Sequence, residues 1–277
     1  MNRSVLVLGL LAIAMSSNAL GAGFLGPPTA EMQKGQWGIG YNYTYIDTDF
    51  DKTTMTEYIY LDGTLNEASS ERMHAEDIKI HRHYGTIAYA VADWWEAYVQ
   101  LGVADVKMKT RYEGERWTGI NFDNDFAWGW GTRLTFHEQS NTRWGFSAQM
   151  NWLDTDADAP FMDSLDDTTY TGQTDVSFET YDLLLAVGPT VDMGGWILYG
   201  GPFYYYLSGD YDLDITALSG GGSVLIEDAH ADLEEDSNFG GFIGAQFDLW
   251  ENAGMTTEFS FTGAGWAAGA GLMWRTR

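Results

Sequence analysis

Three short acidic motifs recur along the chain, each with carboxylates two residues apart. They read DTDFD at residues 47–51, DTDAD at residues 154–158 and DYDLD at residues 210–214. Carboxylates in this pattern can ligate a divalent cation or supply a catalytic acid and base. The candidate metal ligands are Asp47, Asp49, Asp51, Asp154, Asp156, Asp158, Asp210, Asp212 and Asp214. An EF-hand loop also needs Gly at its sixth position and Glu at its twelfth, which all three motifs lack. They are therefore weak metal sites, and loosely bound divalent cations are the only cofactor class they suggest.

The N-terminal residues of the sequence predict an exported protein. One Arg precedes an apolar run from Val5 to Met15, and small residues follow it. This order is typical of a secretory signal peptide, which we place at residues 1–22. Residues 23–35 are expected to form a short periplasmic segment, and residues 36–277 the folded domain. The sequence has no Cys, so disulfides and thiol chemistry are excluded.

The charge of the chain is strongly negative and unevenly distributed. The formal net charge is −26, and no Lys or Arg occurs between Trp144 and Trp274. Nucleic acids and anionic surfaces need clustered cations on a protein partner. The sequence therefore predicts no nucleic-acid partner.

Strict alternation of side-chain type marks several strands. In residues 37–45, 126–136 and 144–152, large apolar side chains alternate with small or polar ones. A soluble β-sandwich would carry mostly Val, Ile and Leu on its buried face and charges on the other. Aromatic side chains opposite small or polar ones instead favour a membrane barrel, with aromatics toward lipid and small residues in the bore.

Ten such segments can be counted, separated by connections that alternate between short and long. The segments lie near residues 36–47, 77–90, 95–108, 123–137, 144–154, 176–190, 196–209, 238–249, 255–263 and 266–275. The long connections are 48–76, 109–122, 155–175 and 210–237. We expect an all-β fold: a single transmembrane antiparallel up-and-down β-barrel of about ten strands (8–12), with short periplasmic turns and long acidic outer loops.

Two stretches carry a family resemblance. VADWWEAYVQLGVAD and FTGAGWAAGAGLMWR resemble the general family of small bacterial outer-membrane β-barrel proteins. The resemblance implies location in the Gram-negative outer membrane, contact with outer-membrane lipid and lipopolysaccharide, and insertion by the barrel-assembly machinery. Family members commonly end on an aromatic residue, whereas here three residues follow Trp274, which displaces that signal.

The same alternation predicts a charged network inside the bore. Its members are Lys79, His81, His83, Arg133, Asp182, Asp248 and Glu258. Buried charges need partners, so we expect Arg133 and Lys79 to meet Glu258, Asp182 and Asp248 and to close the lumen. His81 and His83 could reach one metal ion from a shared strand face, but further ligands are not evident.

Three functions remain open. The first is a structural or surface-interaction barrel with a largely side-chain-filled lumen. The second is a small cation-leaning porin or channel. The third is an omptin-like or lipid-acting enzyme at the outer rim, which is the least supported. His74 and His230 fall in expected outer loops, but nothing fixes an Asp–His pair, so no catalytic residue is assigned.

Strand parity also gives the acidic motifs a location. The motifs at residues 47–51 and 154–158 continue the outward aromatic faces of the strands before them. The motif at residues 210–214 has the opposite parity to Phe203, Tyr205 and Leu207, so a bulge would be needed to turn it outward. We interpret the motifs as markers of the outer membrane boundary. Their chemistry is expected to be collective charge, which divalent cations could bridge to lipopolysaccharide phosphates.

Overall fold

The computed structural model describes residues 25–49, 53–112, 118–165, 168–234, 238–263 and 265–276. The expected signal peptide and Asp51 lie outside these ranges. Every regular element in the described ranges is a β-strand. No helix among the described residues is long and apolar enough to cross a membrane.

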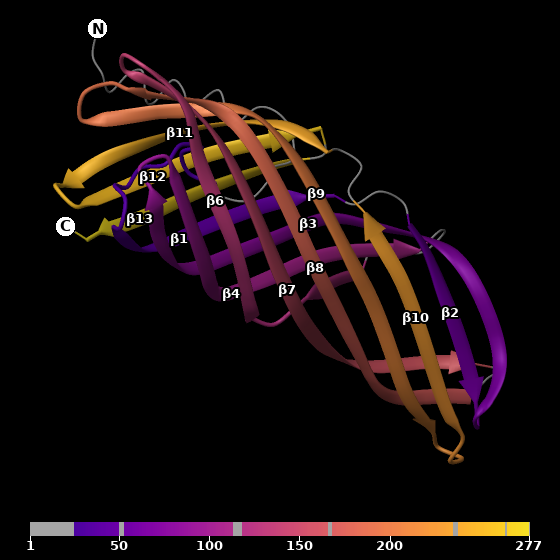
Figure 1. Ribbon diagram of the computed structural model, residues 1–277. Helices are drawn as coiled ribbons and strands as arrows, with labels where there is room; N and C mark the ends of the chain where they lie inside the picture. The colour runs from indigo at the N-terminus through magenta and orange to yellow at the C-terminus, as the bar shows by residue number, and fades with distance from the viewer. Residues whose placement is uncertain are drawn as a thin grey trace, which may run out of the picture.

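Ten antiparallel strands close into a ring (Figure 1). In chain order they are β1 (Trp37–Thr48), β3 (Thr64–Ala92), β4 (Trp95–Tyr112), β6 (Asp125–Gln139), β7 (Thr142–Leu165), β8 (Thr168–Asp192), β9 (Trp196–Ser219), β11 (Phe239–Trp250), β12 (Ala253–Thr262) and β13 (Gly265–Arg275). The first and last strands close the ring, pairing from Gly38 with Arg275 to Thr48 with Gly265. The predicted antiparallel barrel of about ten strands is confirmed.

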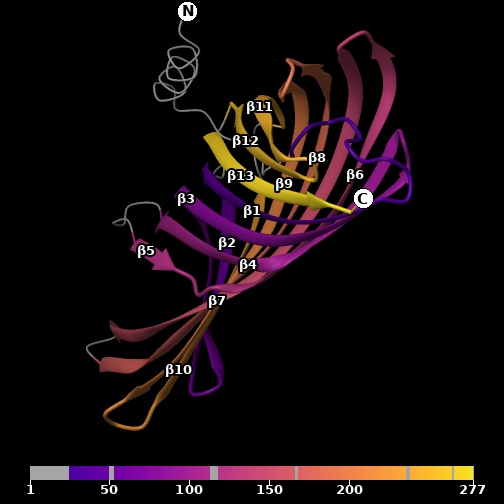
Figure 2. The same ribbon diagram turned by 90° about the vertical axis from the view of Figure 1, so that its left-hand side faces the viewer.

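Three further strands extend one end of the ring. They are β2 (Thr53–Leu61), β5 (Thr118–Asn121) and β10 (Val224–Glu234). Strand β10 pairs with β9 and β2, and β2 pairs with β3. Figures 1 and 2 show β7, β8, β9 and β10 reaching well beyond β11, β12 and β13. We call this the outer end, and the opposite end, which carries the short turns, the periplasmic end.

Most residues of three expected outer loops, at 48–76, 155–175 and 210–237, lie in strands rather than loops. The reason is that side-chain alternation continues beyond the aromatic band. Inward residues such as Met55, Tyr211 and Leu233 are buried, while the acidic residues between them face solvent. Each extended strand therefore has one apolar face to pack, which stabilises it as a sheet.

The wall and the interior of the ring have opposite chemistry. Ile39, Trp128 and Trp130 are among many large side chains exposed on the outer wall. Inside, the periplasmic half is lined mainly by polar and small residues. A continuous apolar cluster fills the outer half, where it includes Ile80 and Phe178, and it extends to Leu25 and Tyr199 in the periplasmic half. The predicted faces of residues 37–45, 126–136 and 144–152 are those observed.

Candidate functional site

An N-terminal segment occupies the periplasmic half of the lumen. The sequence predicts a periplasmic segment at residues 23–35, but the part described from Leu25 to Met32 lies inside the barrel. The backbone N–H groups of Leu25 and Gly26 donate to the two carboxylate oxygens of Glu258, at 2.9 and 3.0 Å. Arg133 donates to the carbonyl oxygen of Leu25 at 2.7 Å. Backbone groups of the segment thus pair with charged side chains of the barrel wall.

A second set of contacts holds the following residues. The carboxylate of Glu96 accepts the backbone N–H groups of Glu31 and Met32. Arg143 donates to the carbonyl oxygen of Ala30 at 2.7 Å and to both carboxylate oxygens of Glu31, at 2.8 and 2.9 Å. A cavity of about 50 Å³ remains beside the segment, which is room for little more than a few waters.

Farther along the bore, one ion pair spans the lumen. Arg82 on β3 and Asp182 on β8 meet at 2.6 Å, with 2% and 0% of their side chains exposed. Strands β3 and β8 are not neighbours in the ring, so the pair crosses the interior. Asn151 donates to the other oxygen of Asp182 at 2.6 Å. Tyr84 and Tyr205 are buried beside the pair.

The predicted lumen network is only partly inside. Arg133, Asp182 and Glu258 lie in the interior, and Arg133 is 3.8 Å from Glu96. Asp248 is exposed near the β11–β12 turn. Arg82, the partner of Asp182, was missed.

The expectation that Lys79, His81 and His83 face the lumen is wrong. His83 and His81 hydrogen-bond the outward hydroxyls of Tyr41 and Tyr43, each at 2.7 Å, and Lys79 pairs with Asp77. The inward residues of this stretch of β3 include Ile78, Ile80 and Arg82. The cause is that polar side chains occur on both faces of this stretch and apolar ones also point inward, so polarity does not mark the inner face.

The acidic motifs of β7 and β9 combine with residues of β8 and β10 into three rows across the outer wall. Strand register places each row side by side, and every member is exposed or partly exposed. The first row is Asp154, Glu179, Asp210 and Asp232; the second is Asp156, Ser177, Asp212 and His230; the third is Asp158, Asp175, Asp214 and Asp228. We call these twelve positions the acidic face. No bulge is needed in β9, because Phe203, Tyr205 and Leu207 point inward, contrary to the expected parity.

The motif at residues 47–51 does not join these rows. Asp47 accepts a hydrogen bond from Tyr45 at 2.9 Å, and Asp49 accepts the backbone N–H of Asp77 at 2.7 Å. Asp51 falls outside the described residues. This motif therefore acts locally, at the end of β1 and at the middle of β3.

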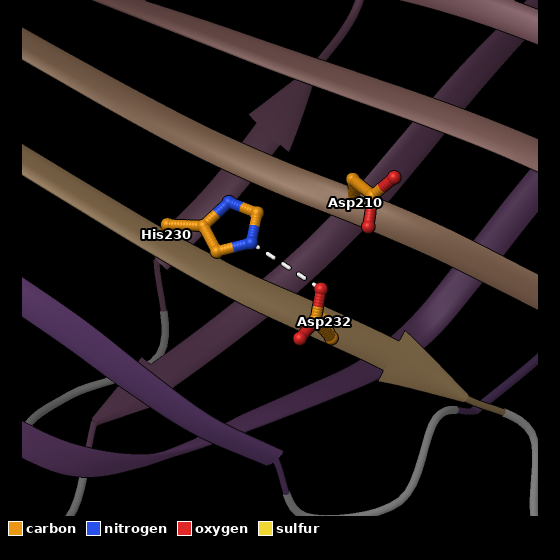
Figure 3. A group of neighbouring side chains, drawn as sticks. All are labelled: Asp210, His230 and Asp232. Atoms are coloured by element: carbon orange, nitrogen blue, oxygen red, sulfur yellow. Dashed lines mark hydrogen bonds and ion pairs between the residues drawn. The ribbon is translucent and has the colours of Figure 1, made fainter.

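One group on the acidic face could hold a metal ion (Figure 3). Asp210, His230 and Asp232 each offer a ligand atom, and the three atoms lie within 4.8 Å of one another. The Nδ1 atom of His230 is 2.6 Å from Asp212, and its Nε2 atom is 3.3 Å from Asp232. A carboxylate on one ring nitrogen commonly orients the other toward a metal. The hydrogen bond to Asp212 raises the pKa of His230, which favours the protonated imidazole over a metal ligand.

Comparisons with known proteins give the fold a context. No family model matches the chain, and no curated protein matches it. Among solved structures, it is similar to the outer-membrane protease OmpT of Escherichia coli, with 11% identity, a TM-score of 0.47, and coverage of 86% of this chain and 97% of that one. The outer-membrane protein OprG of Pseudomonas aeruginosa shows 10% identity, a TM-score of 0.35, and coverage of 90% and 99%. The attachment invasion locus protein Ail of Yersinia pestis shows 11% identity, a TM-score of 0.29, and coverage of 88% and 100%.

The architecture itself decides the class of protein. A closed antiparallel ring leaves no strand edge exposed to hydrocarbon, and the aromatic outer wall surrounds an interior with polar side chains. The chain is a β-barrel of the transmembrane type.

Like-charge crowding perturbs the acidic face of this barrel. Burial, followed by neighbouring carboxylates, raises the pKa values of Asp156 and Asp214 above their ordinary value. For Asp214 the carboxylate with the largest effect is Asp228, its cross-strand partner on β10. Like charges directly opposite in a sheet are destabilising, so the face is under electrostatic strain at neutral pH.

The buried ion pair gives a first prediction. Replacement Arg82→Met leaves Asp182 buried without its cation, and we expect the free energy of unfolding to fall by about 3–5 kcal/mol. The double variant Arg82→Met with Asp182→Leu removes both charges and should recover most of the loss. Urea unfolding in lipid vesicles, followed by tryptophan fluorescence, measures both. A double variant as unstable as the single one would contradict this account.

The acidic face gives a second prediction. A carboxyl group whose pKa is raised in the folded state contributes stability below its unfolded pKa, and this contribution is lost as the pH rises through the folded pKa. Amide hydrogen exchange in β9 and β10, corrected for intrinsic rates, should therefore show more protection near pH 4 than near pH 7. Asp214→Asn should reduce this difference. The control is Asp77→Asn, because Lys109 and Lys79 lower the pKa of Asp77, so its contribution has the opposite pH dependence. Equal protection at both pH values would contradict the prediction.

Proposed function

We propose that this barrel lies in the bacterial outer membrane, has a closed lumen and acts through its outer surface as a structural or surface-interaction protein. The proposal is supported by the groups that lie in each half of the bore. In the periplasmic half, the N-terminal segment is bonded to Glu96, Arg133 and Glu258. In the outer half, an apolar cluster from opposite walls meets across the interior.

A filled bore argues against the alternative of a small cation-leaning channel. An ion needs a continuous polar path, and the desolvation cost of a bare charge in an apolar core is very large. The interior of a barrel near this size is just wide enough for side chains to fill it. Here the Arg82–Asp182 pair and the cluster beyond it occupy that space.

The outward surface carries the exposed carboxylates that a partner could bind. The acidic face carries ten carboxylates in twelve positions, and no Lys or Arg lies between Trp144 and Trp274. The partners that we propose are divalent cations, loosely held, and through them the phosphates of lipopolysaccharide. Outer-membrane lipid surrounds the aromatic wall, and the barrel-assembly machinery inserts the chain. The same charge disfavours nucleic acid.

The lumen proposal is tested by planar-bilayer recordings. We expect the purified protein to give no step currents, because both halves of the bore are closed. A variant that lacks residues 25–34 removes the periplasmic seal and serves as the matched control. It should also stay silent, because the apolar cluster remains. Steps from the intact protein would overturn the closed-lumen proposal, and steps from the deletion variant alone would show that the outer half is not a seal.

The cation proposal is tested by thermal unfolding in neutral detergent. We expect a higher melting temperature in millimolar calcium than in chelator, because a divalent cation relieves repulsion between cross-strand carboxylates. The variant Asp158→Asn, Asp175→Asn, Asp214→Asn removes most of one row and should show a smaller calcium effect. An unchanged melting temperature in the unaltered protein would contradict this part of the proposal.

A further inference from the structure

A groove lies on the outer wall where the aromatic band meets the acidic face. It is an open hollow of about 320 Å³ across β6, β7, β8 and β9. The side of the groove nearer the periplasmic end is formed by Trp128, Trp152 and Tyr181, which strand register places side by side. The side nearer the outer end is formed by Asp154, Glu179 and Asp210, which belong to the first row of the acidic face. The groove therefore joins an apolar floor to an anionic edge.

The aromatic floor is preorganised. The rings of Trp128 and Trp152 stack with centroids 4.3 Å apart and an angle of 8° between their planes. Trp128 is 41% exposed and Tyr181 is 36% exposed, so both offer surface to a ligand. Aromatic faces attract ammonium groups as well as hydrocarbon, with Trp the strongest of the three aromatic types for cations.

The anionic edge pairs with no Lys or Arg among the described residues, and one base, His230, lies beside Asp210. Strands β7 to β10 contain no Lys, and their only Arg is Arg143 at the periplasmic end. Among the described residues, no Lys or Arg forms an ion pair with Asp154, Glu179 or Asp210. Glu179 lies between Asp154 and Asp210 in the row, so each carboxylate is about 5 Å from the next across the strands.

We infer that the groove binds a cationic amphiphile: a molecule with an ammonium headgroup and a hydrocarbon chain. The ammonium group sits among Asp154, Glu179 and Asp210, and the first methylenes cover Trp128 and Trp152. The rest of the chain follows the aromatic wall into the bilayer. This inference rests on the proposed function at the outer surface and names a ligand class for it.

Charge and shape together select this occupant. An inorganic cation satisfies the carboxylates but leaves the aromatic floor exposed. An anionic headgroup is repelled by the acidic edge. A neutral alkyl chain packs on the aromatic floor but makes no favourable interaction with the carboxylates. Only a ligand with both an ammonium group and a chain uses both sides of the groove.

Isothermal titration calorimetry on the full protein in dodecyl maltoside micelles tests the inference. The probes are octyltrimethylammonium, which has head and chain, tetramethylammonium, which has the head alone, and calcium. We expect saturable binding of octyltrimethylammonium beyond its partition into empty micelles. Tetramethylammonium should bind at least about tenfold more weakly, since burial of two methylenes accounts for that factor.

Two variants, each lacking three carboxylate charges, distinguish binding at the groove from a general effect of net charge. Asp154→Asn, Glu179→Gln, Asp210→Asn removes three charges at the groove. Asp158→Asn, Asp175→Asn, Asp214→Asn removes three charges two rows farther along the strands. We expect the first variant to lose saturable binding and the second to stay within about twofold of the unaltered protein, because the carboxylates at the groove contact the ammonium directly. Heat-dependent migration in detergent gels verifies that both fold.

Three results would overturn the inference: equal loss in the two variants, absence of saturable amphiphile binding, or calcium binding at the groove without amphiphile binding. The variant Trp152→Leu keeps every charge and should narrow the difference between octyltrimethylammonium and tetramethylammonium. An unchanged difference would also count against it. Failure here leaves the closed lumen standing, since only step currents from the intact barrel would overturn that proposal.

Discussion

Closure of the sheet into a ring is the constraint on which the rest of this structure depends. Once ten strands close, every second side chain must enter one narrow bore, and each must find a partner there. The chain meets this demand in two ways. Polar side chains in the periplasmic half bond to one another or to the N-terminal segment, and apolar side chains in the outer half pack together. On β3 the change occurs around Arg82, with Ile80 on its outer side and Thr86 on the other.

The N-terminal segment and the charged side chains of the barrel wall provide each other with hydrogen-bond partners. A segment outside the sheet has backbone N–H and C=O groups with no ladder partner, and such groups are costly when buried. Glu96 and Glu258 are likewise costly without donors. Their carboxylates accept four backbone N–H groups of the segment, while Arg133 and Arg143 donate to its carbonyls. Hence the segment is held in the periplasmic half by mutual satisfaction of polar groups.

Alternation alone was sufficient to predict the barrel, but it could not tell which face is inner where both faces carry large side chains. Aromatic residues mark the wall in residues 37–45, whereas Phe203 and Tyr205 pack inside. The same ambiguity misplaced His81 and His83, because the assumption of a polar lumen fails in the outer half. Residues 25–32 have no periodic pattern, so their place in the bore depends on tertiary contacts that no local signal encodes. Each acidic motif was visible singly, but only strand register aligns them with residues of β8 and β10.

The acidic face shows how a barrel wall can carry charge that disfavours its own sheet. Cross-strand carboxylates such as Asp214 and Asp228 repel each other, and neutral substitutes would pair better. The strands stay paired because their inward residues, among them Tyr211, Ala229 and Leu233, are buried in the apolar cluster. Stability is thus supplied by one face, which leaves the other face free of a structural role. Among the described residues, no Lys or Arg pairs with the carboxylates of this face. The proposed cationic ligand would relieve their repulsion, and the aromatic groove beside the first row is where that ligand also buries hydrocarbon.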